Sequence, residues 1–370
     1  MRVLILGAGA SKVAGYPLAS ELIPAIRSMC ERDGGGLRGA WGAWLEFKNK
    51  LSDPLRLVLD SSNPEVVFSA LDLFDAAIES HGIADGATNE EAKKWFGERR
   101  QLQVGQRMRA TLAALLYEYL KLRHSEDGRP EARQHRRYLD QLLQTYKKGD
   151  VVITFNWDVL VERCLAEAGR WTPADGYGIE VQLLRNNQPL PGVPTTSEIA
   201  VLKLHGSLGW HQRALFPPGL VFDGPGVFAD LGFPVDNHPV HVLNADPNMT
   251  LSDYRDRYAE HYMQEPLFFY PSYFKRLVMP EFQSIWTEAA RALQEADDID
   301  VWGYSLPDAD SAARALLNPL RFRLEQKSAA VRVHDPNYRV LLRWEHFLGE
   351  GVEGSEETLG EAPASGSHVS

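Results

Sequence analysis

The stretch DVVITFNWDVLVERCL occupies residues 150–165. Its apolar run VVI is typical of a short buried strand, and apolar residues at helical spacing begin at Val159. Between the two patterns stand Thr154, Asn156 and Asp158, in the sequence TFNWD. A strand that turns at once into a helix predicts a βα unit. Polar side chains at the carboxyl end of such a strand lie where open α/β sheets bind their ligands.

Other short apolar segments share this strand character, and most of them precede a turn and a helical pattern. They are residues 1–6, 200–204, 300–304 and 331–333. The alternation of strand and helix predicts an α/β fold, a Rossmann-like parallel sheet with helices on both of its faces.

The remainder of the chain divides by composition. Residues 31–149 contain long stretches at helical spacing and no clear strand, which predicts a large helical insertion. The sheet domain would then comprise residues 1–30 and 150–348. Residues 349–370 are polar and rich in Gly, Ser and Glu, so we expect a disordered tail.

Charge and hydropathy exclude several classes of protein. The net charge of −11 argues against general nucleic-acid binding. Residues 93–148 are basic although the whole chain is acidic, because they contain fourteen Lys and Arg and six Asp and Glu, an excess of +8. This excess is typical of a solvated helical face, although it could also dock an acidic partner or a nucleic acid. No apolar run is long enough for a bilayer span or a signal peptide, so we expect a cytoplasmic protein.

The chain contains two cysteines, Cys30 and Cys164. That number excludes a four-cysteine zinc site and a disulfide framework. The histidines and carboxylates show no metal-binding spacing such as HExxH, so we expect no metal.

The first strand leads into the sequence GAGAS. Gly7, Ala8, Gly9, Ala10 and Ser11 would let the backbone approach a ligand closely, and the following helix would present its amides to a phosphate. The full dinucleotide fingerprint has a third glycine where this chain has Lys12. A tight strand-to-helix turn without any ligand therefore remains the alternative.

A further strand end also carries a polar side chain. LHGS places His205 at the end of a strand, where an imidazole can serve as a general base. An ordinary loop histidine is the alternative, and we expect His81, His124 and His135 to lie on the surface. In TFNWD, the alternative role of Asn156 or Asp158 is to cap the next helix.

The last two motifs lie late in the chain. GYSLPDAD begins at Gly303, and the backbone amides from Gly303 to Ser305 could hold a phosphate or a ribose. In the sequence HDP, Asp335 offers a carboxylate to a ribose or to a purine edge. Each motif taken alone is also compatible with an ordinary strand-turn-helix joint.

GAGAS, TFNWD, LHGS and GYSLPDAD, in this order, resemble the motifs of the sirtuin superfamily. The similarity is greatest to its bacterial sirtuin-like branch, which cleaves NAD in anti-phage defence. The resemblance covers the sheet framework from residue 3 to about 336 and leaves out the helical insertion.

This resemblance implies an NAD⁺ hydrolase that releases nicotinamide and ADP-ribose. Asn156 would hold the nicotinamide ribose and the attacking water, His205 would be the base, and Asp158 would orient the turn. The GAGAS segment would hold the pyrophosphate, with Thr154 nearby. Gly303, Ser305 and Asp335 would lie on the adenosine side.

The chain also departs from the deacetylases of that family. It has no CxxC pair for their structural zinc, and AGYPLAS replaces their Phe-Arg loop. These departures count against peptide deacetylation. The alternatives that stay open are a non-catalytic NAD or ADP-ribose sensor, a zinc-free deacylase, and an ordinary nicotinamide oxidoreductase, against which the missing third glycine counts. A free NAD hydrolase would harm its host, so we expect gating by a homo-oligomer contact or a defence partner, with the basic helical segment as the sensor surface.

Overall fold

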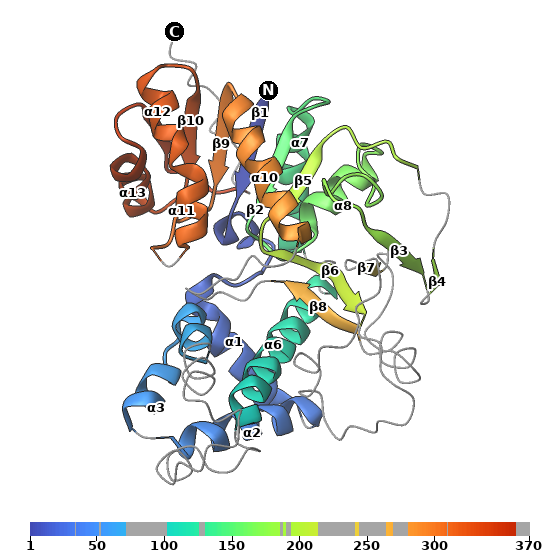
Figure 1. The fold of residues 1–370 in the computed structure, drawn as a ribbon, viewed down its shortest axis with the longest axis vertical. Coiled ribbons are helices and arrows are strands. Elements are labelled where there is room, and N and C mark those ends of the chain that lie inside the picture. Colours follow the sequence, from blue (N-terminus) through green and yellow to red (C-terminus); the bar gives the residue numbers. More distant parts are fainter. Residues whose placement is uncertain are drawn as a thin grey trace.

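The computed structural model describes residues 1–33, 35–51, 53–71, 102–125, 130–185, 188–189, 194–213, 241–243, 264–268, 280–308 and 310–359. Figure 1 shows an upper α/β body above a layer of helices.

A six-stranded parallel sheet forms the centre of the upper body, in the order β11-β10-β9-β1-β2-β5. Its strands are β1 (Arg2–Leu6), β2 (Val151–Thr154), β5 (Ala200–Lys203), β9 (Asp298–Trp302), β10 (Ala330–His334) and β11 (Val352–Ser355). Val3, Leu4 and Ile5 of β1 are all fully buried, as expected of a central strand that is covered on both faces.

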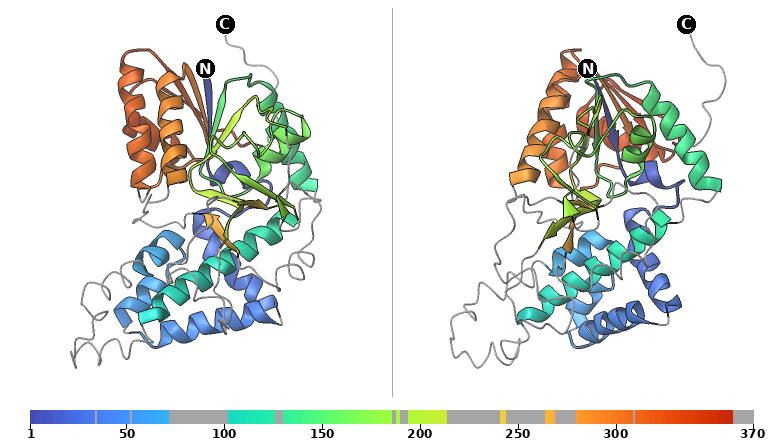
Figure 2. Two further views of the ribbon diagram at one scale, coloured as in Figure 1. Left: turned by 45° about the vertical axis from the view of Figure 1, so that its right-hand side comes forward. Right: turned by 90° about the vertical axis from the view of Figure 1, so that its right-hand side faces the viewer.

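Helices cover both faces of this sheet, which confirms the predicted fold class (Figure 2). One face carries α7 (Pro130–Gln144) and α8 (Leu160–Glu167). The other carries α10 (Pro280–Glu295), α11 (Ser311–Leu317), α12 (Pro319–Glu325) and α13 (Tyr338–Leu348). Right-handed crossovers explain the division, since the chain runs outward from β1 to β5 on one side and from β9 to β11 on the other.

This change of direction falls between β1 and β9, which are neighbours in the sheet. In open α/β sheets, the crevice beyond the carboxyl ends of the strands at such a switch point is the usual ligand site. The strands of this sheet that Figure 1 labels end toward the helical layer, and all strands of the sheet are parallel. The turns after β1 and β9 therefore lie side by side at the edge that faces it.

The helical layer contains α1 (Ala19–Arg32), α2 (Gly36–Asn49), α3 (Asp53–Leu59) and α6 (Leu102–Ser125). Its apolar contacts include Trp41 and Trp44 of α2, which are at most 6% exposed. Helix α1 packs against α2 and α6, whereas α7 packs against α8 of the upper body. The described part of residues 31–149 contains helices only, although these helices belong to both layers.

A second sheet, which the sequence did not predict, lies at the edge of the upper body. Its order is β4-β3-β7-β6-β8, from β3 (Gln182–Arg185), β4 (Gln188–Pro189), β6 (Gly206–Arg213), β7 (His241–Leu243) and β8 (Gln264–Phe268). Only two residues, Leu204 and His205, separate the end of β5 from the start of β6, so His205 lies in the turn that joins the two sheets.

The disordered tail predicted for residues 349–370 is wrong for its first part, because β11 pairs in parallel register with β10. Its sequence VEGS is polar, but an edge strand needs little apolar surface of its own. Gly354 lets α13 pack closely, since a Cβ there would lie 3.3 Å from Leu341 Cδ1. Residues 360–370 lie outside the described residues.

A charge cluster joins three central strands. Asp300 of β9 accepts hydrogen bonds from Arg332 of β10 at 2.8 Å and from Arg2 of β1 at 2.9 Å. The Tyr146 hydroxyl donates to the same carboxylate at 2.8 Å. Burial alone would raise the pKa of Asp300, but these hydrogen bonds and the arginine charges lower it below its usual value.

Candidate functional site

The strand ends are aligned across the sheet. Leu6 pairs with Thr154 on one side and with Trp302 on the other, and Thr154 pairs with Lys203. His334 pairs with Trp302. The segments GAGAS, TFNWD, LHGS, GYS and HDP therefore leave the same edge of the sheet at the same level.

The glycine turn is a short 3₁₀ helix, Ala8–Ser11, held against the turn that follows β9. A Cβ on Gly303 would lie 2.1 Å from the Ala10 amide nitrogen, and one on Gly7 would lie 2.5 Å from Tyr304 Cα. Gly303 also has a φ of +61°. These glycines are needed because two backbones touch.

The amides of this turn are largely engaged within the protein. The Gly7 amide donates to Trp302 O at 3.0 Å, the Gly9 amide to Gly303 O at 2.9 Å, and the Ala10 amide to Gly7 O at 2.9 Å. The Gly7 and Gly9 amides thus join the glycine turn to the end of β9 and the turn after it, and the Ala10 amide closes the glycine turn itself.

Asn156 connects the TFNWD turn to the glycine turn. Its Nδ2 donates to Gly7 O at 2.9 Å and to Ser11 Oγ at 3.1 Å. Gly7 O can only accept a hydrogen bond, so the atom facing it must be the amide nitrogen rather than Oδ1. Both amide hydrogens are used in this way. The atom that Asn156 can offer to a ligand is therefore Oδ1, a hydrogen-bond acceptor.

Asp158 contacts both the start of α8 and the glycine turn. Its Oδ1 accepts from the Leu160 amide at 3.1 Å, and its Oδ2 accepts from Ser11 Oγ at 2.7 Å. The side chain is mostly buried. The N-cap position of α8 itself is Val159, so Asp158 is not the cap but bonds to the first helical amide from one residue further back.

His205 faces a carboxylate. Its Nε2 lies 3.3 Å from Asp310 Oδ2, and both residues are buried. The Tyr304 hydroxyl donates to the same Oδ2 at 3.1 Å, and the Ala313 amide donates to Oδ1 at 3.3 Å. Burial and the charge of Asp310 raise the pKa of Tyr304, so its hydroxyl stays protonated as a donor.

The contact with Asp310 determines which nitrogen of His205 can act. A proton on Nε2 is favoured by the facing carboxylate, and in that tautomer Nδ1 is the nitrogen that carries the lone pair. If the ring took up a proton, Asp310 would stabilise the imidazolium, as the carboxylate does in hydrolase triads. The ring is held in place by Phe155, which meets it edge-on at 5.2 Å and stacks on Tyr304 at 4.1 Å.

A cavity of about 740 Å³ opens beside these groups. Its volume lies within the usual range for ligand sites. The predicted site residues on its wall are Ala8, Gly9, Ser11, Asn156, Asp158, His205, Gly303, Ser305 and Asp335. Gly7, Ala10 and Thr154 do not line it. Gly7 lies behind the turn, while Ala10 and Thr154 line a smaller cavity beneath it.

Asp335 lies at the β10 end of the large cavity, away from Asn156 and His205. Its Oδ1 accepts from the Asn337 amide at 2.9 Å. Burial raises its pKa, and this hydrogen bond opposes the rise. The cavity wall also carries Lys12 and Arg343, and Arg343 Nη1 donates to Ser305 O at 2.7 Å.

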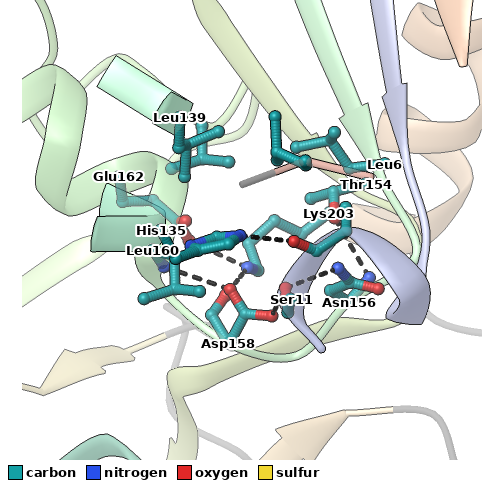
Figure 3. Close-up of a pocket in the computed structure, with 13 residues that line it drawn as sticks. Leu6, Ser11, His135, Leu139, Thr154, Asn156, Asp158, Leu160, Glu162 and Lys203 are labelled. Carbon is teal, nitrogen blue, oxygen red and sulfur yellow. Dashed lines mark hydrogen bonds and ion pairs between the residues drawn. The ribbon is translucent and has the colours of Figure 1, made fainter. Parts of the chain in front are cut away.

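The smaller cavity, about 10 Å³, lies beneath the TFNWD turn (Figure 3). His135 of α7 lines it and bonds through Nε2 to the carbonyl of Ala10. The prediction that His135 lies on the surface is wrong, since the residue is 1% exposed. The sequence of a helix shows which of its faces is apolar. It does not show that a histidine on that face contacts the carbonyl of a residue far away in the chain. His81 and the side chain of His124 lie outside the described residues.

Sequence reasoning also missed Asp310, Lys203 and Glu162 as members of the site. Asp310 carried a signal, because an Asp directly before SAARALL is typical of a helix N-cap. Lys203 stands in an apolar strand and Glu162 on an apolar helix face, where charged residues are rarely buried unless paired. Lys203 is 0% exposed, and its Nζ lies 2.9 Å from Glu162 Oε1.

Within the described residues, no group of three or more His, Cys, Asp or Glu side chains is arranged to hold a metal ion. None of the described helices carries an apolar stretch long enough to cross a bilayer.

No protein-family model and no curated protein matches the chain. Solved structures that resemble it include a complex of a mutant Sir2 homologue with ADP-ribose, at 16% identity and a TM-score of 0.30, covering 91% of this chain and 80% of that one. Another, described as bearing on the mechanism and regulation of Sir2 enzymes, has 14% identity and a TM-score of 0.36, covering 97% and 88%. A Sir2 protein bound to a propionylated peptide has 13% identity and a TM-score of 0.34, covering 91% and 81%. Because these TM-scores are low, conclusions about function rest on the geometry of the site.

Proposed function

We propose that the protein is an NAD⁺ hydrolase that cleaves NAD⁺ to nicotinamide and ADP-ribose. One observation carries the proposal: Asn156 and His205 line the same cavity as the glycine turn, although they come from different strand ends. The motif resemblance to NAD-cleaving sirtuin-like proteins supplies the substrate.

In this reaction, the bond between C1′ of the ribose and the nicotinamide nitrogen breaks, and its electron pair leaves with neutral nicotinamide. The sugar carbon becomes electron-poor, and a water oxygen bonds to it. The hydrogens of that water need acceptors, so Asn156 Oδ1 would accept one hydrogen bond and His205 Nδ1 would take the proton. A general base contributes about 100- to 10,000-fold in rate, so positioning must supply much of the rest.

The two ends of the substrate would lie at different strands. The nicotinamide ribose would lie near β2 and β5, beside Asn156 and His205. The adenosine would extend toward β9 and β10, where Ser305 and Asp335 line the cavity. For the pyrophosphate, the engaged amides of the glycine turn leave Ala8 and the ammonium of Lys12, both exposed on the cavity wall, as the favoured contacts.

The test is purified protein incubated with NAD⁺ and assayed for nicotinamide and ADP-ribose, with Asn156→Ala as the comparison. We expect the wild type to release both products in equal amounts and the variant to lose at least about 99% of the rate. If calorimetry detects NAD⁺ binding but the wild type releases neither product, even with candidate partners present, the protein is a sensor.

We further propose that this activity is gated and serves anti-phage defence in the cytoplasm, through a homo-oligomer or a partner protein. The resemblance supplies the role, and the cavity wall supports the gating. Leu22 of α1 and Leu120 of α6 line the cavity, so a partner that moves the helical layer would change the site. NAD⁺ levels in cells with and without phage challenge test this role, and a fall that follows infection only with the wild-type protein would support it.

A further inference from the structure

A buried ion pair lies directly beneath the TFNWD turn. Lys203 ends β5 with no exposed surface, and Glu162 on the first turn of α8 is 4% exposed in its side chain. Their charged atoms are 2.9 Å apart, and the Tyr177 hydroxyl lies 3.4 Å from the same Glu162 oxygen. Burying two charges costs more free energy than their attraction usually returns. An apolar pair would fill this space at least as well, so the pair calls for a role other than stability.

Lys203 also holds the backbone of the turn. Its Nζ donates to the carbonyl oxygen of Asp158, in addition to pairing with Glu162. From Asp158 the contacts continue to the site, since Ser11 Oγ donates to Asp158 Oδ2 at 2.7 Å and Asn156 Nδ2 donates to Ser11 Oγ at 3.1 Å. Figure 3 shows these side chains converging beneath the turn. A continuous set of hydrogen bonds therefore runs from the ion pair to the amide of Asn156.

Glu162 also lines the small cavity, and the second oxygen of its carboxylate, the buried Oε2, has no hydrogen-bond donor among the described residues. Glu162, Lys203, Ser11 and Asp158 all line the small cavity, whose volume of about 10 Å³ corresponds to one water molecule. A water here would have several polar partners, as buried waters require.

We propose that Lys203 and Glu162, with one water molecule bound in the small cavity against Glu162 Oε2, form a positioning device that fixes the TFNWD turn and so aims Asn156 into the large cavity. Lys203 supplies the donor that holds Asp158, and Glu162 fixes the position of the Lys203 Nζ atom. Neither residue touches the substrate. The role of this device in turnover rests on the proposed function, whereas its effect on the turn does not.

The test separates positioning from stability by removing the charges singly and together. Lys203→Met leaves Glu162 buried and unpaired, so we expect a clear fall in melting temperature. The double variant Lys203→Met/Glu162→Gln has no buried charge and should recover most of that fall. It still lacks the donor to Asp158, so we expect its kcat for NAD⁺ to remain about 10- to 100-fold below wild type, with KM changed less than threefold. A double variant with wild-type kcat would overturn the proposal.

Glu162→Gln alone provides the matched comparison, because it retains Lys203 and its bond to Asp158. Its kcat should lie closer to wild type than that of the double variant, and the reverse order would contradict the proposal. A crystal structure of the wild type should show a water molecule within hydrogen-bond distance of Glu162 Oε2. If the small cavity holds no electron density, the proposed water is wrong.

Crystal structures of the wild type and of the double variant test the proposal even if the wild type does not hydrolyse NAD⁺. In that case the proposed function has failed, and the device is judged from the turn itself. A displaced Asn156 side chain in the double variant would support the device, and an unchanged turn would overturn it.

Discussion

Asn156 shows how a single side chain joins two distant parts of the chain. Both of its amide hydrogens go to the glycine turn, to Gly7 O and to Ser11 Oγ. Only Oδ1 remains for a ligand, which makes the residue an acceptor in the large cavity. At this scale the function depends on hydrogen-bond direction, because a carboxylate of the same shape could not donate to Gly7 O.

Asp310 acts on a single atom of His205, so its removal should affect turnover more than folding. Asn retains the helix cap but carries no charge to stabilise an imidazolium. We expect Asp310→Asn to lower kcat for NAD⁺ by about 10- to 1,000-fold with KM nearly unchanged, measured by steady-state nicotinamide release. Asp308→Asn is the control, because that side chain is 90% exposed and pairs with Arg314. Equal rates for both variants would exclude a role for the His205–Asp310 contact.

Gly303 tests whether glycine is needed for its conformation or for space. Its φ is +61°, and an added Cβ would lie 2.1 Å from Ala10 N. Gly149 has a φ of +92° but no atom within 4 Å of an added Cβ. We expect Gly149→Ala to lower the free energy of unfolding by about 1–2 kcal/mol and Gly303→Ala by about 3–5 kcal/mol, measured by urea denaturation. Equal losses would mean that the contact between the two turns contributes little.

At the scale of elements, the parallel strands set the level at which every site loop begins. The pairing of Leu6 with both Thr154 and Trp302 brings the turns after β1, β2 and β9 together. On these same strands, the Asp300 cluster joins β1, β9 and β10 through Arg2 and Arg332. The alignment of the site thus depends on contacts within the sheet as well as on the loops.

The Asp300 cluster makes the sheet sensitive to acid. The pKa of Asp300 is lowered in the folded protein, so its stabilisation is complete above the unfolded pKa of about 3.9 and is lost as the pH falls through the folded value. We expect Asp300→Asn to lower the free energy of unfolding by about 2–4 kcal/mol at pH 7 and pH 5, and by less below about pH 4. Urea denaturation at these pH values measures it, with the exposed Glu353→Gln on β11 as control. A difference that does not change with pH would contradict this account.

At the scale of the whole molecule, the large cavity belongs to no single layer. Strand-end turns form one wall, Leu22 and Leu120 of the helical layer form another, and Thr358 after β11 contributes from near the end of the described chain. A ligand in this cavity would contact segments that are far apart in the sequence. Its binding should therefore stabilise the whole chain rather than one loop.

ADP-ribose provides a test that does not require turnover. At 100 times its Kd it should raise the free energy of unfolding by about 2.7 kcal/mol, seen as a rise in melting temperature. Lys12→Ala should weaken its binding about tenfold, because a charge-assisted contact to the pyrophosphate is lost. Lys50→Ala is the control, since Lys12 and Lys50 are both exposed lysines paired with a glutamate, Glu21 and Glu46, and Lys50 does not line the cavity. The same Kd in both variants would remove Lys12 from the phosphate site.

The sequence alone determined the parallel sheet, most of its strands and the strand-end loops whose residues line the large cavity. An apolar run followed by a polar turn and a helical pattern can be recognised from neighbouring residues alone, without knowledge of the rest of the chain. For that reason TFNWD and LHGS could be assigned to strand ends directly from their residues. The second sheet and β11 could not be foreseen, because all of their strands except β6 have five residues or fewer and depend on backbone pairing that a local pattern does not reveal.

Only the tertiary structure decided which groups meet. It placed Asp310 against His205, buried Lys203 with Glu162 beneath the turn, and brought His135 to the carbonyl of Ala10. It also engaged the glycine-turn amides with the backbone after β9. Charged and polar side chains carry no local signal of their partners, since hydrogen bonds act over about 3 Å in space and are indifferent to separation along the chain.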